Sequence, residues 1–225
     1  TMNPNELMLL TDFYEYTMSY AYFKENKHEE IGYFDMFVRK IPDGGGYLIA
    51  NGLHRFIEFI QDFHFTDAQI DYLRSTGYFD EDFLTYLKNL KMDIDVWAVP
   101  EGTPVFANEP LVTIRGKLIQ AQIVETILLV FINYSTLVTT KASRIVAASR
   151  GRAVLEFGSR RAHGIDAATE GARACYIAGA RGTACTLAGQ KYAVPVSGTV
   201  AHSYIQLHDS EYEAFLQYAR VSPDN

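Results

Sequence analysis

The sequence contains few cysteines and no long apolar run. Its 225 residues include only two cysteines, Cys175 and Cys185, and they lack the C-x-x-C spacing of metal and redox sites. We therefore expect reduced, buried thiols rather than a disulfide or a metal site. The longest apolar run, residues 126–132, is too short to cross a bilayer. The N-terminus lacks the pattern of a secretory signal, so the sequence predicts a cytoplasmic protein without a membrane anchor.

Positive charge is scarce in the first part of the chain. Residues 1–101 carry 8 Lys and Arg against 18 Asp and Glu, and the whole chain has a formal net charge of −7. This balance argues against general binding to nucleic acid or to membranes. Residues 141–181, in contrast, carry 8 Lys and Arg against 3 Asp and Glu. Such local positive charge suits a small polyanionic ligand, and a solvated basic helix face explains it equally well.

The first half of the chain has the patterns of an α/β domain. With 48% hydrophobic residues, the 225-residue chain can bury a full core. Apolar residues recur at helical spacing over 7–25, where Thr11 or Asp12 could cap a helix start and leave the first few residues extended. They alternate as in a strand over 31–39. The glycine-rich turn 42–46 lacks the GxxxxGK[ST] form of a phosphate loop, which favours a plain turn. Further patterns predict helices over 52–63, 67–75 and 80–90 and strands over 93–98 and 111–115, with Trp97 packed beneath the strand 93–98.

The second half alternates helices with short strands. One long helix, or two in sequence, is predicted over 119–149, followed by a short buried strand over 152–157. A helix of small residues is expected over 166–179, with short strands near Thr183 and Val194 and a last helix from Asp209. Strands that alternate with helices predict βαβ units and a parallel sheet, and therefore the α/β fold class.

Two segments of this half carry residues suited to an anion site. Arg160 and Arg161 follow the predicted strand 152–157, and Thr199 and His202 lie in the run PVSGTVAHS. Because the carboxyl ends of strands face the ligand crevice in βα architectures, the two segments are expected to meet across one pocket. Arginine grips phosphate or carboxylate with two parallel hydrogen bonds, and a neutral histidine can act as a nucleophile or a proton carrier. Purely structural roles remain the alternative, and His163 has a weaker claim than His202.

Several motifs in the chain resemble those of one enzyme family. FGSRRAHG-x-DAA, GARA-x-YI-x-G, GT-x-x-x-x-AG and PV-x-GT-x-AHS are similar to central motifs of nicotinate phosphoribosyltransferases. LLTDFYEYTM, FVRKIPDGGGYLIANGL, PEGTPVFANEPLVTI and ETILL also resemble that family, in the family's order. The resemblance implies an irregular type II phosphoribosyltransferase α/β barrel over residues 118–225, incomplete here, behind an N-terminal α/β domain over residues 1–117. The family continues past the position of Asn225 into the second half of its barrel, which leaves open whether the 225-residue piece alone is active.

The resemblance also implies a reaction and a set of site residues. Nicotinate would attack phosphoribosyl pyrophosphate to give nicotinate mononucleotide and pyrophosphate for NAD salvage, with ATP hydrolysis and with Mg²⁺ on the pyrophosphate. ATP would phosphorylate His202, and Tyr14 would stack on the nicotinate ring, in the partner subunit's site of a homodimer. The implied substrate-binding residues are Tyr14, Ser159, Arg160, Arg161, His163 and Thr199. The alternatives are a related enzyme that uses nicotinamide or quinolinate, and a truncated non-catalytic binding or dimerisation module.

Overall fold

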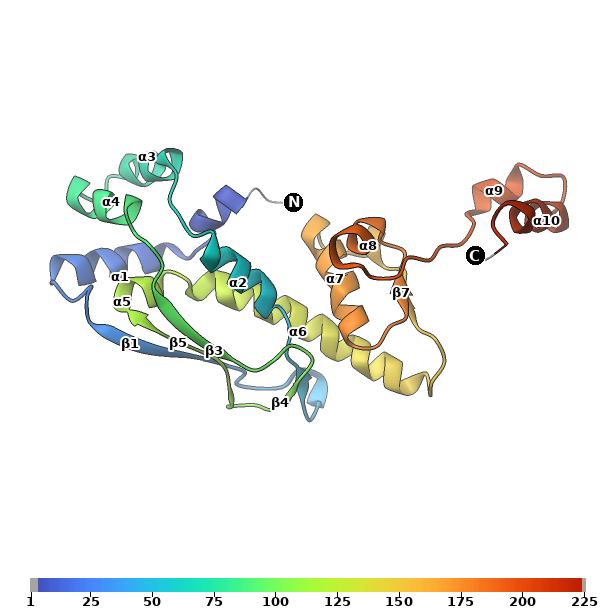
Figure 1. Cartoon of the computed structure of the whole chain (residues 1–225), viewed down its shortest axis with the longest axis horizontal. Helices are drawn as coiled ribbons and strands as arrows, with labels where there is room; N and C mark the ends of the chain where they lie inside the picture. Colours follow the sequence, from blue (N-terminus) through green and yellow to red (C-terminus); the bar gives the residue numbers. More distant parts are fainter. Residues whose placement is uncertain (1–3, 224–225) are drawn as a thin grey trace. The chain divides into compact units, whose positions relative to one another are not determined.

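The computed structural model describes residues 4–223. The chain forms two compact units, which divide between Ser143 and Arg144 (Figure 1). This division lies later than the predicted domain boundary between residues 117 and 118, because most of a long helix that begins at Glu125 belongs to the first unit. The domain boundary itself stays a prediction.

The N-terminal segment forms two helical pieces, and the second begins directly after Asp12, one of the two positions at which a helix start was expected. A 3₁₀ helix, η1, spans Pro4–Leu9, and helix α1 spans Phe13–Lys24. Asp12 has an extended backbone between them, and its N–H donates to the Thr126 hydroxyl at 3.1 Å. A long-range contact therefore holds the chain at this break, and the residues before it form a 3₁₀ helix rather than the extended segment that was expected.

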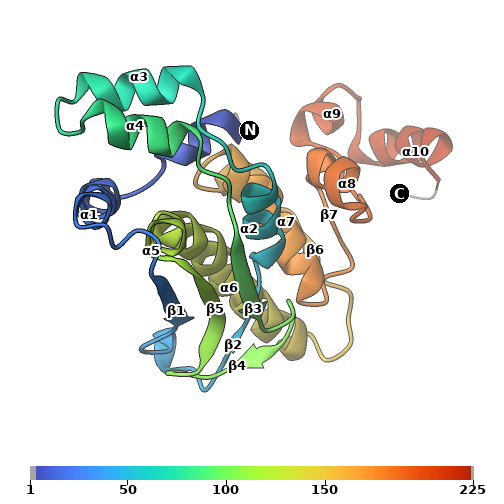
Figure 2. The ribbon, with the colours of Figure 1, turned by 60° about the vertical axis from the view of Figure 1, so that its left-hand side comes forward.

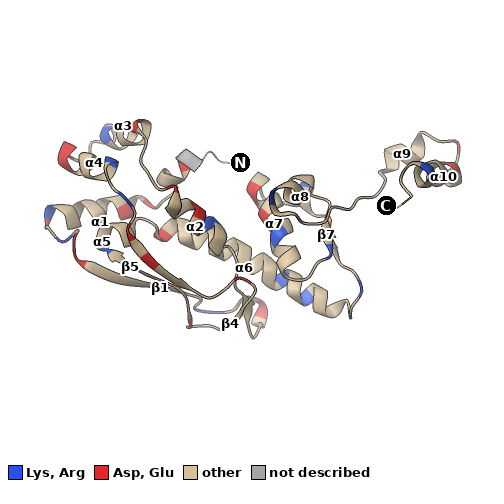
Figure 3. Ribbon diagram, viewed as in Figure 1, with Lys and Arg blue, Asp and Glu red and all other residues tan. Residues whose placement is uncertain are grey.

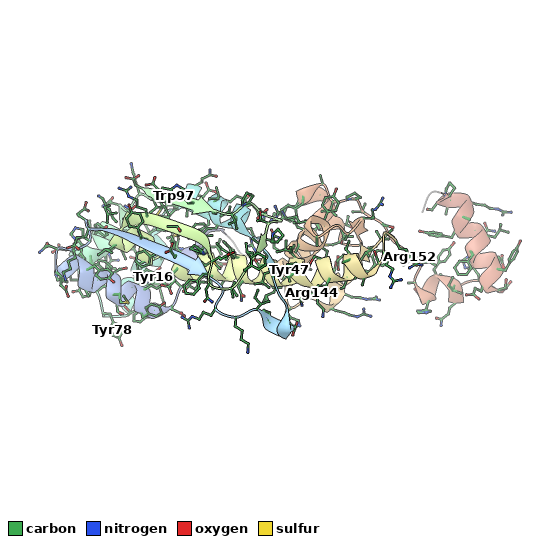
Figure 4. All side chains as sticks on the ribbon, turned by 90° about the horizontal axis from the view of Figure 1, so that it is seen from below. Tyr16, Tyr47, Tyr78, Trp97, Arg144 and Arg152 are labelled. Atoms are coloured by element: carbon green, nitrogen blue, oxygen red, sulfur yellow. The ribbon has the colours of Figure 1, made fainter. Side chains whose placement is uncertain are left out.

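The main sheet of the first unit is antiparallel and has the order β1-β5-β3, as Figure 2 shows. Its strands are β1 (Ile31–Phe37), β3 (Ile94–Ala98) and β5 (Pro110–Lys117), close to the predicted bounds. The prediction that Trp97 packs beneath its strand is wrong, because its side chain is 55% exposed on the outer face (Figure 4). Alternation along β3 turns Val96 toward the core and Trp97 away from it.

Helices and short connections complete this sheet domain. The glycine-rich segment is a turn, as predicted, and includes a short 3₁₀ helix η2 (Pro42–Gly44). Strands β2 (Leu48–Ile49) and β4 (Pro104–Val105) form a small antiparallel pair. Helices α2 (Leu53–Gln61), α3 (Asp67–Ser75) and α4 (Glu81–Lys88) lie within the predicted ranges. The Thr66 and Asp80 side chains cap α3 and α4 by accepting backbone N–H groups, which explains why both helices begin where they do.

Two helices in sequence follow the sheet. Helix α5 spans Leu118–Gln122, and helix α6 spans Glu125–Ala148. The stretch Leu118–Ala148 is apolar and long enough to cross a membrane by length and composition, and 56% of its most apolar window is buried within the protein. A core helix has the same character. Phe131 and Ile132 of α6 join the apolar core of the first unit, and the buried Thr136 and Thr140 accept backbone N–H groups of Asn51 and Ile49.

The second unit contains a short βαβ series, as predicted. Its elements are β6 (Leu155–Glu156), a 3₁₀ turn η3 (Ser159–Arg161), α7 (Ile165–Ile177), β7 (Gly182–Thr183), α8 (Thr186–Tyr192), α9 (His202–Gln206) and α10 (Glu211–Val221). Strands β6 and β7 are parallel, and Thr183 also forms a parallel bridge with Val196. The fold is therefore α/β, without a closed barrel among residues 4–223.

The strand before the arginine pair is shorter and more exposed than predicted. Only Leu155 and Glu156 pair as a strand, and Leu155 is 42% exposed. The expectation of a buried strand over residues 152–157 is wrong because β6 lies in a sheet of only two strands, where it pairs with β7 along one edge. The strand predicted near Val194 is likewise reduced to the single bridge at Val196.

Small residues let the segments of the second unit lie close together. Ala172, Ala174 and Ala188 are buried, so helices α7 and α8 contribute little side-chain bulk to its interior. A Cβ atom on Gly182 would lie 2.5 Å from the carbonyl oxygen of Pro195. Backbones in this small-residue stretch therefore approach each other closely at this point.

Gly52 provides a test of the packing in the first unit. Its φ of +101° disfavours any residue with a Cβ, and a Cβ would lie 2.3 Å from the Phe131 carbonyl oxygen. We expect Gly52→Ala to lower the free energy of unfolding by about 2–5 kcal/mol, because strain and overpacking both act there. Urea unfolding measures this change.

Gly46→Ala is the matched control. Gly46 has no atom within 4 Å of a built Cβ, so its substitution should change the free energy of unfolding by no more than about 0.5 kcal/mol. Equal unfolding midpoints for both variants would contradict the close contact between Gly52 and α6.

Candidate functional site

The arginine pair lies on a turn at the carboxyl end of β6. Gly158 precedes the turn η3, and the Arg161 N–H donates to the Gly158 carbonyl at 2.8 Å. The side chains of Arg160 and Arg161 are exposed, whereas the Ser159 hydroxyl oxygen is buried and has no hydrogen-bond partner among the described residues. The turn therefore presents two guanidinium groups to solvent from a fixed backbone.

The histidine segment begins at the same edge of the parallel strands. Thr183 ends β7, and its carbonyl accepts the Ser197 N–H at 3.0 Å, just after the bridge to Val196. From there the chain continues through the exposed Thr199 to His202, which is the first residue of α9 and is also exposed. His163 is exposed as well and lies between η3 and α7. Both segments thus follow the carboxyl ends of parallel-paired residues. That they meet across one pocket, and the roles of their residues, stay predictions.

Basic residues of the second unit occur on several different elements. Figure 3 shows blue Lys and Arg on the end of α6, on α7 and in connecting segments, rather than along one helix. Arg160 and Arg161 belong to η3, Arg173 to α7, and Arg152 to the connection before β6. The positive charge noted in the sequence is therefore not the face of a single helix. It comes from short segments around the small parallel sheet.

Tyr14 lies in the first unit, on the exposed side of α1. Its ring is 43% exposed, and its hydroxyl donates to Glu125 Oε1 at 2.8 Å. The hydrogen bond to Glu125 raises the pKa of Tyr14 to about 12, with smaller contributions from burial and from the negative charges of Glu125, Glu15 and Asp12. The ring is not a core aromatic, which was the structural alternative. Its hydroxyl is anchored while part of the residue remains exposed.

A second carboxylate fixes the helix that carries Tyr14. Glu15 is fully buried, and its Oε1 accepts both the N–H of Thr126 at 3.1 Å and the Thr126 hydroxyl at 2.6 Å. Thr11 donates to the other carboxylate oxygen. Burial raises the pKa of Glu15, and these hydrogen bonds lower it in part. The motif LLTDFYEYTM therefore joins α1 to the start of α6 through Glu15 and positions the neighbouring tyrosine.

Sequence reasoning missed two residues next to the arginine turn. Glu156, the last residue of β6, accepts the Gly158 N–H and the Thr183 hydroxyl through its carboxylate. Phe157 is 39% exposed directly before the turn, and an exposed aromatic beside two arginines suits a flat anionic ligand. Two features of the sequence could have indicated them: Glu156 is an acidic residue inside an apolar run, and Phe157 is an aromatic residue directly before Gly158.

The described residues do not form a metal centre of their own. Among residues 4–223, no group of three or more His, Cys, Asp or Glu side chains is arranged to hold a metal ion. Cys175 and Cys185 are half-buried free thiols, and burial, with the Glu156 charge, raises the pKa of Cys175 to about 11. Such a thiol is a poor ligand and a poor nucleophile at neutral pH.

Comparisons with known proteins identify the relatives of this chain. Residues 9–133 match the family model of the nicotinate phosphoribosyltransferase (NAPRTase) N-terminal domain. The chain is 46% identical over 215 residues to the nicotinate phosphoribosyltransferase pncB2 of Mycobacterium tuberculosis, which covers 96% of this chain and 46% of that protein. The chain thus spans slightly less than half the length of such a curated relative.

Solved structures share the fold. The crystal structure of human nicotinic acid phosphoribosyltransferase matches with a TM-score of 0.81 and 34% identity, over 88% of this chain and 40% of that one. The nicotinate-nucleotide pyrophosphorylase from Pyrococcus furiosus matches with a TM-score of 0.78 and 21% identity, over 98% of this chain and 49% of that one. The second likeness concerns the fold alone, which is that of type II phosphoribosyltransferases.

The anchored hydroxyl of Tyr14 predicts an unusual titration. At pH 10.5 a tyrosine with a pKa of about 10 is roughly three-quarters ionised, whereas one with a pKa of about 12 is only about 3% ionised. The phenolate absorbance at pH 10.5 should therefore be the same for the protein and its Tyr14→Phe variant. Because the folded pKa is raised, the stabilisation from this contact is complete below about pH 10 and is lost as the pH rises toward 12.

Glu125→Ala supplies the comparison for this titration. Without the carboxylate, the pKa of Tyr14 should fall toward its usual value, so adding Tyr14→Phe to Glu125→Ala should remove up to about three-quarters of one tyrosine's phenolate absorbance at pH 10.5. Circular dichroism at the same pH confirms that the variants are folded. A normal Tyr14 titration in the unsubstituted protein would rule out the anchoring contact.

Proposed function

Because the chain belongs to the nicotinate phosphoribosyltransferase family, we propose that the protein containing it transfers a phosphoribosyl group to nicotinate. The observation that carries the proposal is the arrangement of β6 and β7, whose carboxyl ends lead into the arginine turn and toward His202. We propose that the arginine turn would bind an anion and that the His202 imidazole would act as a nucleophile in the same site.

The proposed reaction forms one bond and breaks another at the same carbon. The nicotinate ring nitrogen attacks C1 of phosphoribosyl pyrophosphate, and the C1–O bond to pyrophosphate breaks with its electron pair leaving on oxygen. The ribose acquires oxocarbenium character while the pyrophosphate gains negative charge. The protein contributes chiefly by positioning the substrates and by stabilising that charge.

We assign anion binding to the arginine turn. Arg160 and Arg161 are exposed on η3 and would bind the phosphates of phosphoribosyl pyrophosphate or the carboxylate of nicotinate. The Ser159 hydroxyl, His163 and Thr199 would add hydrogen bonds to the same substrates. Paired arginine forks suit this role because each presents several fixed N–H donors to phosphate oxygens.

His202 is proposed as the group that links the reaction to ATP. An unprotonated ring nitrogen would attack the γ-phosphorus of ATP, ADP would leave, and water would later hydrolyse the N–P bond to release phosphate. The exposed position of His202 at the start of α9 is consistent with this role. The added phosphoryl charge would attract the arginine turn and favour the state that holds the pyrophosphate-bearing substrate.

Mg²⁺ enters this proposal with the substrate rather than as a resident cofactor. The described residues offer no cluster of carboxylates, and both oxygens of Glu156 already accept hydrogen bonds. Mg²⁺ commonly binds substrate phosphates with few protein ligands. It would therefore neutralise pyrophosphate as the charge develops there.

We propose that the protein is a homodimer in the cytoplasm. Tyr14 would stack on the pyridine ring in the partner subunit's site. Its exposed ring and the hydrogen bond to Glu125 support a stacking surface of fixed orientation. Such stacking contributes about 0.5–1.5 kcal/mol beyond the burial of area.

An activity assay tests the proposed function directly. The protein expressed from the complete reading frame that encodes this chain, incubated with nicotinate, phosphoribosyl pyrophosphate and Mg-ATP, should form nicotinate mononucleotide, as measured by chromatography. A preference for nicotinamide or quinolinate would assign a related enzyme. Tight binding of these compounds without any product would indicate a non-catalytic module.

Substitution of either arginine should weaken substrate affinity. We expect Arg160→Ala and Arg161→Ala each to raise the Michaelis constant of one substrate about ten- to a hundred-fold, because a charge-assisted contact contributes about 1.5–3 kcal/mol. Arg181→Ala is the control, since Arg181 is also exposed but precedes β7 at the opposite end of the strand. Unchanged Michaelis constants in both arginine variants would leave the pair with a structural role only.

His202→Asn should separate transfer from ATP hydrolysis. The amide keeps a similar size but removes the nucleophile, so the variant should fold, lose ATP hydrolysis and retain slow transfer without ATP. Incubation with γ-labelled ATP should give an acid-labile, base-stable label on the unsubstituted protein. The control variant His208→Asn should carry the same label. In the unsubstituted protein, Nδ1 of His208 lies 2.9 Å from the Tyr204 carbonyl oxygen. A label of that kind persisting on His202→Asn would falsify the assignment.

A further inference from the structure

Glu156 lies where the arginine turn, β7 and the histidine segment meet. It ends β6 and is paired in register with Thr183, the last residue of the parallel strand β7. One carboxylate oxygen accepts the N–H of Gly158, which opens the arginine turn. The other accepts the hydroxyl of Thr183 at 2.6 Å. A single side chain thus connects two neighbouring strand ends on the side where the arginines lie.

Thr183 extends this connection to the next segments. It is fully buried, and its hydroxyl oxygen also accepts the N–H of Cys185 at 2.9 Å, while its carbonyl accepts the N–H of Ser197 at 3.0 Å. The backbone carbonyl of Glu156 accepts the Ala184 N–H at 2.9 Å. Through Thr183, the carboxylate is therefore connected to the start of α8 and to the segment that continues toward His202.

The charge of Glu156 is unusual in its surroundings. Residues 141–181 carry 8 Lys and Arg against 3 Asp and Glu, yet both oxygens of Glu156 accept neutral donors. If its purpose were to neutralise Arg160 or Arg161, the carboxylate would point at a guanidinium. It holds the backbone of the turn instead, which leaves the two arginines available for an anion.

We propose that Glu156 is a positioning residue that fixes the arginine turn relative to β7 and the segment leading to His202. The proposal rests on the proposed function in that the arginines bind the anionic substrate. Without the carboxylate, the Gly158 N–H and the Thr183 hydroxyl lose their partners, and the turn must be ordered when the anion binds. Affinity for the anion should then fall although neither arginine is changed.

Binding of pyrophosphate, measured by calorimetry with Mg²⁺ present, tests this role without the transfer reaction. We expect Glu156→Ala to weaken pyrophosphate binding about ten-fold and Glu156→Gln to weaken it less than about three-fold. The glutamine keeps an oxygen for the Gly158 N–H, and its amide can donate to Thr183. Equal losses in both variants would mean that the charge matters rather than the position, and would overturn the proposal.

A double-mutant cycle with Arg160→Ala separates positioning from a general loss of stability. If Glu156 acts through the arginine turn, the double variant should bind pyrophosphate clearly more tightly than the product of the two single effects predicts. Additive effects would overturn the proposal. Urea unfolding checks that all variants are folded. If Glu156→Ala does not fold, Glu156→Gln and Thr183→Val replace it in the test. An unchanged affinity of Thr183→Val for pyrophosphate would then contradict the proposal.

Hydrogen exchange of the Gly158 amide gives a readout that does not depend on the ligand. Exchange should be faster in Glu156→Ala and close to that of the unsubstituted protein in Glu156→Gln. Faster exchange with unchanged pyrophosphate binding, while Arg160→Ala binds weakly, would overturn the positioning role and leave the proposed function intact. If neither arginine variant changes pyrophosphate binding, the proposed anion site fails instead.

Discussion

The second unit depends on the parallel pairing of two strands that are each only two residues long. Strands β6 and β7 have few backbone hydrogen bonds to hold them, so side chains and close backbone contacts must fix their alignment. The Glu156 carboxylate reaches Thr183 across the pair, and Gly182 allows the Pro195 carbonyl to approach. This alignment places the arginine turn and the start of the histidine segment at one edge, and the proposed anion site depends on it.

The first unit achieves rigidity in a different way. An antiparallel sheet and a single large apolar core carry most of its structure, and hydrogen bonds between α1 and the start of α6 fix the segment that carries Tyr14. Glu15 accepts two hydrogen bonds from Thr126, and Glu125 holds the hydroxyl of Tyr14. An aromatic ring on a surface helix would otherwise change rotamer freely. Here its hydroxyl is held while part of the ring stays exposed, which is what a stacking surface requires.

Much of this arrangement could be predicted from local sequence patterns. The bounds of α3 were predicted in full because its cap and apolar periodicity are local, and the βαβ order followed from alternating elements. The outward position of Trp97 was not predicted, because alternation alone does not say which face is buried. Glu156 was missed because its partner Thr183 is remote in sequence and becomes a neighbour only when the two strands pair. The exposure of Leu155 was missed for a related reason, since an apolar run cannot report how many strands flank it.

The central claim is that two strand ends form one anion site, and amide chemical-shift mapping with pyrophosphate tests it most directly. The account predicts that amides of residues 158–163 and 197–202 shift together along one saturating curve with a single dissociation constant. Amides of helices α2, α3 and α4 should not respond. Shifts confined to one of the two segments, or two segments that saturate with different dissociation constants, would contradict the claim.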